Sequence, residues 1–146
     1  MSYEKVLRNP ARAGVRRLPA RVEAIVSAAA ASDFVLWRVD LADVRGKGGL
    51  LAALARAIDF PDWFGGNWDA LQDCLGDLSW RPAQGYVVIL EHCRGIAARA
   101  PEVFETALEI FSAAADYWHG RGVPFWVLVG GLDAGQHELP GMNAAE

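Results

Sequence analysis

Cysteine is scarce in this 146-residue chain, where it occurs only at positions 74 and 93. The two cysteines form no Cys-x-x-Cys pair, and no histidine stands at metal-ligand spacing from either one. These absences argue against a zinc site and against a disulfide framework. We therefore expect Cys74 and Cys93 to be free thiols in a reducing compartment. A disulfide between them is the alternative, and nothing in the sequence requires it.

Long apolar runs are absent as well, and no segment is long enough to span a bilayer. Three arginines precede an alanine-rich run at residues 24–31, which faintly resembles a signal peptide. Glu23 and Ser27 interrupt that pattern, so a short amphipathic helix is the better interpretation. We expect a cytoplasmic protein that has no membrane partner.

The sequence also lacks the patterns of cofactor and catalytic sites. The glycine-containing loop at residues 42–49 has neither the GK[ST] ending nor the GxGxxG spacing of phosphate-binding loops. Glu91 and His92 could supply a nuclease with acid and base, but they are adjacent on a strand end, so their side chains diverge. The aspartates show no EF-hand spacing. We predict no enzyme, no cofactor, no metal site and no small-molecule substrate.

Lysine and arginine are absent from the segment of the chain in which aspartates are most concentrated. Residues 1–38 hold seven Lys and Arg against three Asp and Glu, whereas the remainder carries an acidic excess. From residue 58 to 78 there are five aspartates and no Lys or Arg. A surface that binds nucleic acid directly should have the opposite sign, so we expect a positively charged protein partner. The alternative is a basic arm at residues 8–21 that binds nucleic acid, although arginines in such arms are more often solvated.

Hydrophobic periodicity predicts strands that alternate with helices. We expect strands over 34–40, 86–91 and 124–130, and helices over 21–31, 48–58, 67–78 and 101–120. The strand at 86–91 is continuously apolar, which is typical of a central parallel strand covered on both faces. Right-handed crossovers between such strands give the α/β class, with a small parallel sheet.

This pattern divides the chain into three parts. Residues 1–32 form an N-terminal extension with a loose basic arm at 1–14, a short edge strand at 15–18 and a helix. Residues 33–131 form the main α/β domain. Residues 132–146 are glycine-rich and polar, and we expect a flexible, frayed tail.

The predicted helix at 67–78 has one acidic face. Asn67 is a suitable N-cap residue, and Asp69, Asp73 and Asp77 recur every four residues along one side. Each like-charge pair at this spacing should cost roughly 0.2–0.5 kcal/mol, and no Lys or Arg lies one turn away to offset it. A solvated acidic face and a binding face explain this pattern equally well.

An aromatic loop immediately before this helix adds weight to binding. Trp63, Phe64 and Trp68 surround Gly65 and Gly66. At least one of these aromatic side chains should belong to the core. Yet three large aromatics beside an approachable backbone are typical of an interface anchor.

The stretch Phe60–Leu75, which reads FPDWFGGNWDALQDCL, resembles the signature segment of the barstar family, and a weaker similarity extends over about residues 34–130. The resemblance implies a small three-stranded parallel sheet packed with helices. It also implies one-to-one inhibition of a small basic, guanyl-preferring ribonuclease by a loop and helix that plug its active-site cleft. Asp73 would take the phosphate-binding position with Asp69 beside it, and Trp63, Gly65 and Asn67 would supply loop contacts. The whole expected nuclease-binding set is Asp73, Asp69, Trp63, Gly65, Asn67, Phe64, Trp68 and Asp77.

The sequence departs from the family pattern at several positions. Gln72 stands where the best-known member has a tryptophan, and Gly66 replaces an acidic residue. In the last helix, Ala113 and Ala114 fall near a position where that member carries a nuclease-contacting carboxylate, and Asp116 is a candidate substitute. These departures leave a second hypothesis, an immunity or interaction module that keeps the fold and binds a different partner.

Overall fold

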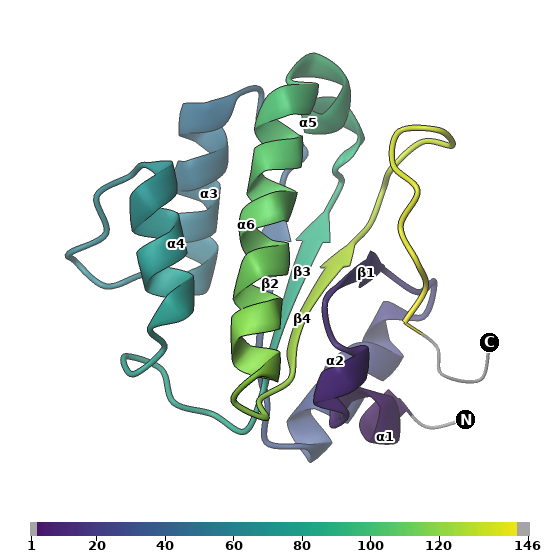
Figure 1. Ribbon diagram of the computed structural model, residues 1–146. Helices are drawn as coiled ribbons and strands as arrows, with labels where there is room; N and C mark the ends of the chain where they lie inside the picture. Colours follow the sequence, from purple (N-terminus) through teal and green to yellow (C-terminus); the bar gives the residue numbers. More distant parts are fainter. Residues whose placement is uncertain (1–2, 143–146) are drawn as a thin grey trace.

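The computed structural model describes residues 3–142 and contains one parallel sheet of four strands (Figure 1). The strands are β1 (Val15–Arg17), β2 (Val35–Asp40), β3 (Tyr86–Glu91) and β4 (Phe125–Val129), and they lie in the order β1-β4-β3-β2. The prediction of three strands is therefore wrong. The short segment expected at the edge pairs with β4, from Val15 opposite Val127 to Arg17 opposite Val129. Because β4 is buried throughout, it needs a neighbour on each side.

Alternate residues of β3 enter two separate hydrophobic cores. Val88 and Leu90 face the larger core, whereas Val87 and Ile89 face the smaller one. This confirms the central, doubly covered strand that the continuous apolar run predicts.

Helices on one face of the sheet cover the larger core. They are α3 (Lys47–Ile58), α5 (Arg94–Arg99) and α6 (Pro101–His119), and α4 (Trp68–Gly76) packs against α6. The predicted helices at 48–58 and 101–120 are confirmed within a residue. The sequence does not reveal α5, because its six residues are too few to show a helical period.

The opposite face of the sheet is covered by the N-terminal residues. Helices α1 (Tyr3–Leu7) and α2 (Val22–Ala31) bury the smaller core, and a 3-10 helix at Pro10–Arg12 links α1 to β1. The loose arm predicted for residues 1–14 is therefore wrong for residues 3–14. Leu7 is fully buried, and its carbonyl accepts a hydrogen bond of 2.9 Å from Nε1 of the buried Trp126. The apolar residues of α1 thus fold onto the sheet despite the arginines around them.

The C-terminal segment also packs onto the sheet, which differs from the frayed tail predicted from Asp133. Arg17 donates from its backbone N–H to the Pro140 carbonyl at 2.7 Å and from Nη1 to the Leu139 carbonyl at 2.9 Å. Met142 is buried in the smaller core. These bonds occupy the outer edge of β1 as far as residue 142, and residues 143–146 lie outside the described part of the chain.

Cys74 and Cys93 are both free thiols, and both are buried. Burial raises the pKa of the Cys74 thiol to about 11 and that of Cys93 to about 12. Within residues 3–142 no group of three or more metal-ligating side chains comes together. In the same part of the chain, no helix combines the length and the apolar character needed to cross a membrane.

Candidate protein-docking site

Helix α4 is held firmly at both ends. The Asn67 side chain accepts a hydrogen bond of 2.8 Å from the Ala70 N–H, which confirms the predicted N-cap. At the other end, Trp118 Nε1 on α6 donates to the Leu75 carbonyl at 2.8 Å. Leu71 and Leu75 are fully buried in the larger core, so the opposite side of α4 must face solvent.

Asp69 and Asp73 lie on this solvent-facing side of α4, and both are exposed. Over residues 3–142, no hydrogen bond or ion pair engages either carboxylate. The charge of Asp73 acts on the interior, because it adds to burial in raising the pKa of the Cys74 thiol. The predicted pair of unpaired carboxylates is therefore present, and it is open to a partner.

Asp77 lies just past the end of α4, so within the helix the acidic face consists of Asp69 and Asp73, and the role of Asp77 in binding stays a prediction. The helix ends at Gly76, and Asp77 follows in extended backbone with φ −130° and ψ 97°. The Asp77 carboxylate accepts a hydrogen bond of 3.1 Å from the Ser79 N–H, and its hydrogen bonds with Ser79 lower the pKa of Asp77. The helix thus ends two residues earlier than predicted, because a glycine and a short acidic side chain that bonds the backbone two residues further on both favour termination.

The aromatic loop divides into one exposed ring and two packed ones. Trp63 is 55% exposed, the largest exposure of a big apolar side chain in the described chain. Phe64 and Trp68 pack against the larger core, and the Phe64 ring centroid lies 4.7 Å from that of Phe60. Trp63 is therefore the aromatic side chain free to act as an anchor, while Phe64 and Trp68 hold the loop in place.

Both glycines of the loop are exposed, but they differ in backbone conformation. Gly66 has φ +73°, a region that disfavours other residues, and a Cβ there would meet nothing. Gly65 has an ordinary φ, and a Cβ there would touch only Ala70 and Asn67 at van der Waals distance. The backbone therefore favours glycine at position 66, whereas Gly65 leaves its backbone open to a close-fitting partner.

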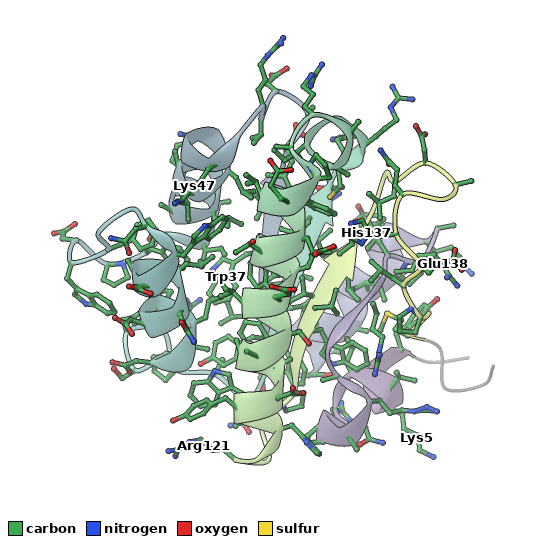
Figure 2. All side chains as sticks on the ribbon, turned by 45° about the horizontal axis from the view of Figure 1, so that its top comes forward. Lys5, Trp37, Lys47, Arg121, His137 and Glu138 are labelled. Atoms are coloured by element: carbon green, nitrogen blue, oxygen red, sulfur yellow. The ribbon has the colours of Figure 1, made fainter. Side chains whose placement is uncertain are left out.

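A cation lies beside this site that sequence reasoning missed. Lys47, which is labelled in Figure 2, lies in the first turn of α3. Its Nζ is 5.4 Å from the centroid of the Trp68 ring. It is 21 residues before Trp68, so no helical spacing could reveal the contact. The ammonium group stabilises the Trp68 ring and also reduces the local negative potential.

Asp116, the candidate substitute in the last helix, does not lie on the α4 side. Ala113 is exposed and Ala114 is buried. Asp116 lines a groove between α6 and N-terminal residues 10–16. In Figure 1 those residues and α4 lie on opposite sides of α6, so Asp116 is no substitute.

Glu91 and His92 diverge, as the sequence predicts. The Arg38 guanidinium donates to the Glu91 carboxylate, with 2.8 Å between Nη2 and Oε2. His92 instead contacts Asp40, with 2.8 Å between Nδ1 and Oδ1. The adjacent acid and base therefore turn to different partners and do not form a catalytic pair.

Together, the fold and this site define a parallel α/β protein that presents a helix with two exposed, unpaired carboxylates and, beside it, an exposed tryptophan. The family model described as Barstar (barnase inhibitor) matches residues 34–130, and the chain belongs to the barstar family. The match contains all eight residues of the expected binding set, although it does not by itself assign their roles.

Comparison with curated proteins gives no match. Among solved structures, the Aeropyrum pernix ORC2 protein, in ADPNP–ADP complexes, matches with a TM-score of 0.58 and 14% identity over 85% of this chain. The match covers 36% of that protein, and it is a likeness of fold alone.

Proposed function

We propose that the chain inhibits a small basic, guanyl-preferring ribonuclease, one to one, by placing α4 and the loop before it in the active-site cleft. Asp73 and Asp69 accept charge-assisted hydrogen bonds from the cations that hold RNA phosphates, and Trp63 packs against the rim. The observation that carries the proposal is the pair of exposed, unpartnered carboxylates on a helix fixed at both ends, within the matched segment.

The unpaired state of the two carboxylates supports this proposal physically. Like charges one turn apart cost the free protein stability, and a cationic partner relieves that cost on binding. The same charges attract such a partner from a distance and raise the association rate at low salt. In this proposal residues 33–131 hold the partner-binding residues, and the protein acts in the cytoplasm as an immunity protein or antitoxin.

The test is a titration of the purified full chain against a small guanyl-preferring ribonuclease, with RNA cleavage as the readout, at low and moderate salt. The proposal predicts stoichiometric inhibition that weakens with added salt, because the contacts are electrostatic. It also predicts that Asp73→Ala loses inhibition while Glu105→Ala, which removes an exposed carboxylate from α6, keeps it. Full inhibition by a folded Asp73→Ala protein would show that the site is assigned wrongly.

A second candidate function is an interaction module for a different protein partner. The α6 surface favours it, because Ala113 is exposed and Asp116 lies in the groove on the far side of α6. Absence of inhibition at micromolar concentration would favour this candidate. A pull-down with the full chain, using Asp73→Ala as the negative control, would then identify the partner.

A further inference from the structure

A second site lies at the carboxyl end of the sheet, away from α4. In open parallel α/β sheets this edge is where small ligands bind. Here a cavity of about 460 Å³ lies between the end of β3, helix α5 and the C-terminal segment. Figure 1 shows α5 above the tips of β3 and β4, beside the returning C-terminal chain. We call it the edge pocket; the residues that matter are His92, Arg94, Gly95, Arg99, Gly131 and Asp133.

Arg99 supplies the first cation of the edge pocket. Its guanidinium folds back over Gly95, where an added Cβ would lie 2.9 Å from Nη1. Within residues 3–142 Arg99 has no hydrogen-bond or ion-pair partner. Glycine at position 95 thus leaves room for an unpartnered guanidinium against the wall of the pocket.

Arg94 supplies the second cation, and its own partner is a weak one. Its Nη1 lies 3.8 Å from Asp133 Oδ1, and both side chains are more than half exposed. An ion pair of that length in solvent contributes little, so an anionic ligand can compete with Asp133 for Arg94. The Gln136 side chain donates to the Arg94 carbonyl at 3.1 Å and fixes the loop that carries Asp133.

His92 is held in a strained conformation that orients its ring. It has φ +59°, which is unfavourable for a residue with a Cβ, and such strain gathers at functional positions. The Gly131 backbone packs closely against it, since an added Cβ on Gly131 would lie 2.9 Å from the His92 Cα. Because Nδ1 contacts Asp40, Nε2 is the ring nitrogen left for a ligand.

We propose that the edge pocket binds the phosphate group of a small molecule. Two guanidinium groups, one of them unpartnered and the other weakly paired, can each donate two parallel hydrogen bonds to phosphate oxygens. His92 Nε2 adds a third donor when the ring is protonated. The cavity is large enough for a phosphate and the small organic group that carries it. None of these residues belongs to the acidic docking site, so the two sites can be tested separately.

The test uses the full chain and calorimetric titration with inorganic phosphate, glycerol 1-phosphate and a short single-stranded RNA. We expect saturable binding of glycerol 1-phosphate, with inorganic phosphate weaker because it lacks the organic group. Arg99→Gln and Arg94→Gln should each weaken binding about tenfold or more, the effect of losing a charged hydrogen bond. Arg81→Gln, which removes an exposed arginine outside the pocket, should leave binding unchanged.

A substitution that keeps every charge tests whether phosphate binding depends on the position of the Arg99 guanidinium or only on the overall positive charge of this surface. Gly95→Ala should weaken glycerol 1-phosphate binding because the new methyl group displaces the Arg99 guanidinium. Equal effects of Arg81→Gln and Arg99→Gln would overturn the proposal, as would unchanged binding by a folded Gly95→Ala protein. Tighter binding of RNA than of either small phosphate would overturn the assignment to a small molecule. Ribonuclease inhibition by Arg99→Gln should equal that of the unmodified chain.

Discussion

Asp73 lies in the middle of α4, exposed and one turn beyond Asp69. Replacing it with alanine removes the carboxylate that the proposed function places closest to the partner's phosphate-binding cations. We expect Asp73→Ala to weaken inhibition more than Asp69→Ala or Trp63→Ala. Its melting temperature should stay the same or rise slightly, because relief of one like-charge pair is worth roughly 0.2–0.5 kcal/mol.

Inhibition titrations and thermal melts of the three variants measure both quantities. Glu105→Ala is the matched control, because it removes the same charge from an exposed position on α6. A large drop in the Asp73→Ala melting temperature would contradict the prediction, because it would give this carboxylate a structural role.

Asp77 should contribute to stability more than to inhibition, unlike Asp73. Its carboxylate accepts a hydrogen bond from the Ser79 N–H just after the end of α4. Hydrogen bonds with Ser79 hold its pKa below the ordinary value, so the carboxylate stabilises the fold above its unfolded pKa. That stability is lost as the pH falls through the lower, folded pKa. Asp77→Ala should therefore lower the melting temperature at neutral pH and lose less stability on acidification to about pH 3.

Thermal melts at the two pH values test the role of Asp77, and ribonuclease titration gives the second readout. Inhibition should change less than for Asp73→Ala, because Asp77 lies beyond the end of α4 and its carboxylate is already bonded to Ser79. Equal loss of inhibition in both variants, with equal melting temperatures, would show that Asp77 contacts the partner as Asp73 does.

At the scale of the element, α4 depends on a single cap. The Asn67 side chain bonds the Ala70 N–H at 2.8 Å, and no other side chain caps this end. Asn67→Ala should cost about 1 kcal/mol of stability, whereas Asn67→Asp should keep most of it because aspartate caps as well as asparagine. Urea unfolding of the two variants gives the free energies directly, and equal losses in both would mean that the cap is not what stabilises α4.

The sequence predicts elements whose signals are local. The cap at Asn67 and the apolar run of β3 were both predictable, because each depends on neighbours in the chain. The end of α4 was not, since the choice between Asp77 as a helical and as a capping residue depends on the backbone after it. Helices α1 and α5 are too short for periodicity to show.

The sequence predicts which residues make up the candidate site, but it does not predict which of their side chains are exposed. Trp63, Phe64 and Trp68 look alike in sequence, and only packing against the core separates the exposed ring from the other two. Lys47 reaches Trp68 through the packing of α3 beside the loop, a contact that leaves no periodic signal. Local chemistry thus locates the site, and tertiary contacts decide which members are free to bind.

At the scale of the whole molecule, the N-terminal residues complete the fold. They supply β1 and the cover over the second face of the sheet, although the family match begins only at residue 34. Val87, Ile89, Trp126 and Leu128 on that face are all fully buried. Burying each such side chain contributes about 1.5–3 kcal/mol, so the four together approach the whole stability of an ordinary domain.

A fragment of residues 34–130 should therefore fail to reach the stability of the full chain, because removal of α1, α2 and β1 exposes that apolar face. We expect a lower melting temperature or aggregation, with binding of a hydrophobic dye, in thermal melts and fluorescence measured beside the full chain. Trp126→Ala in the full chain is the companion variant and should cost about 3–5 kcal/mol. A fragment that melts cooperatively at the temperature of the full chain would show that residues 1–33 are a dispensable extension. The smaller core would then have to be stabilised without them.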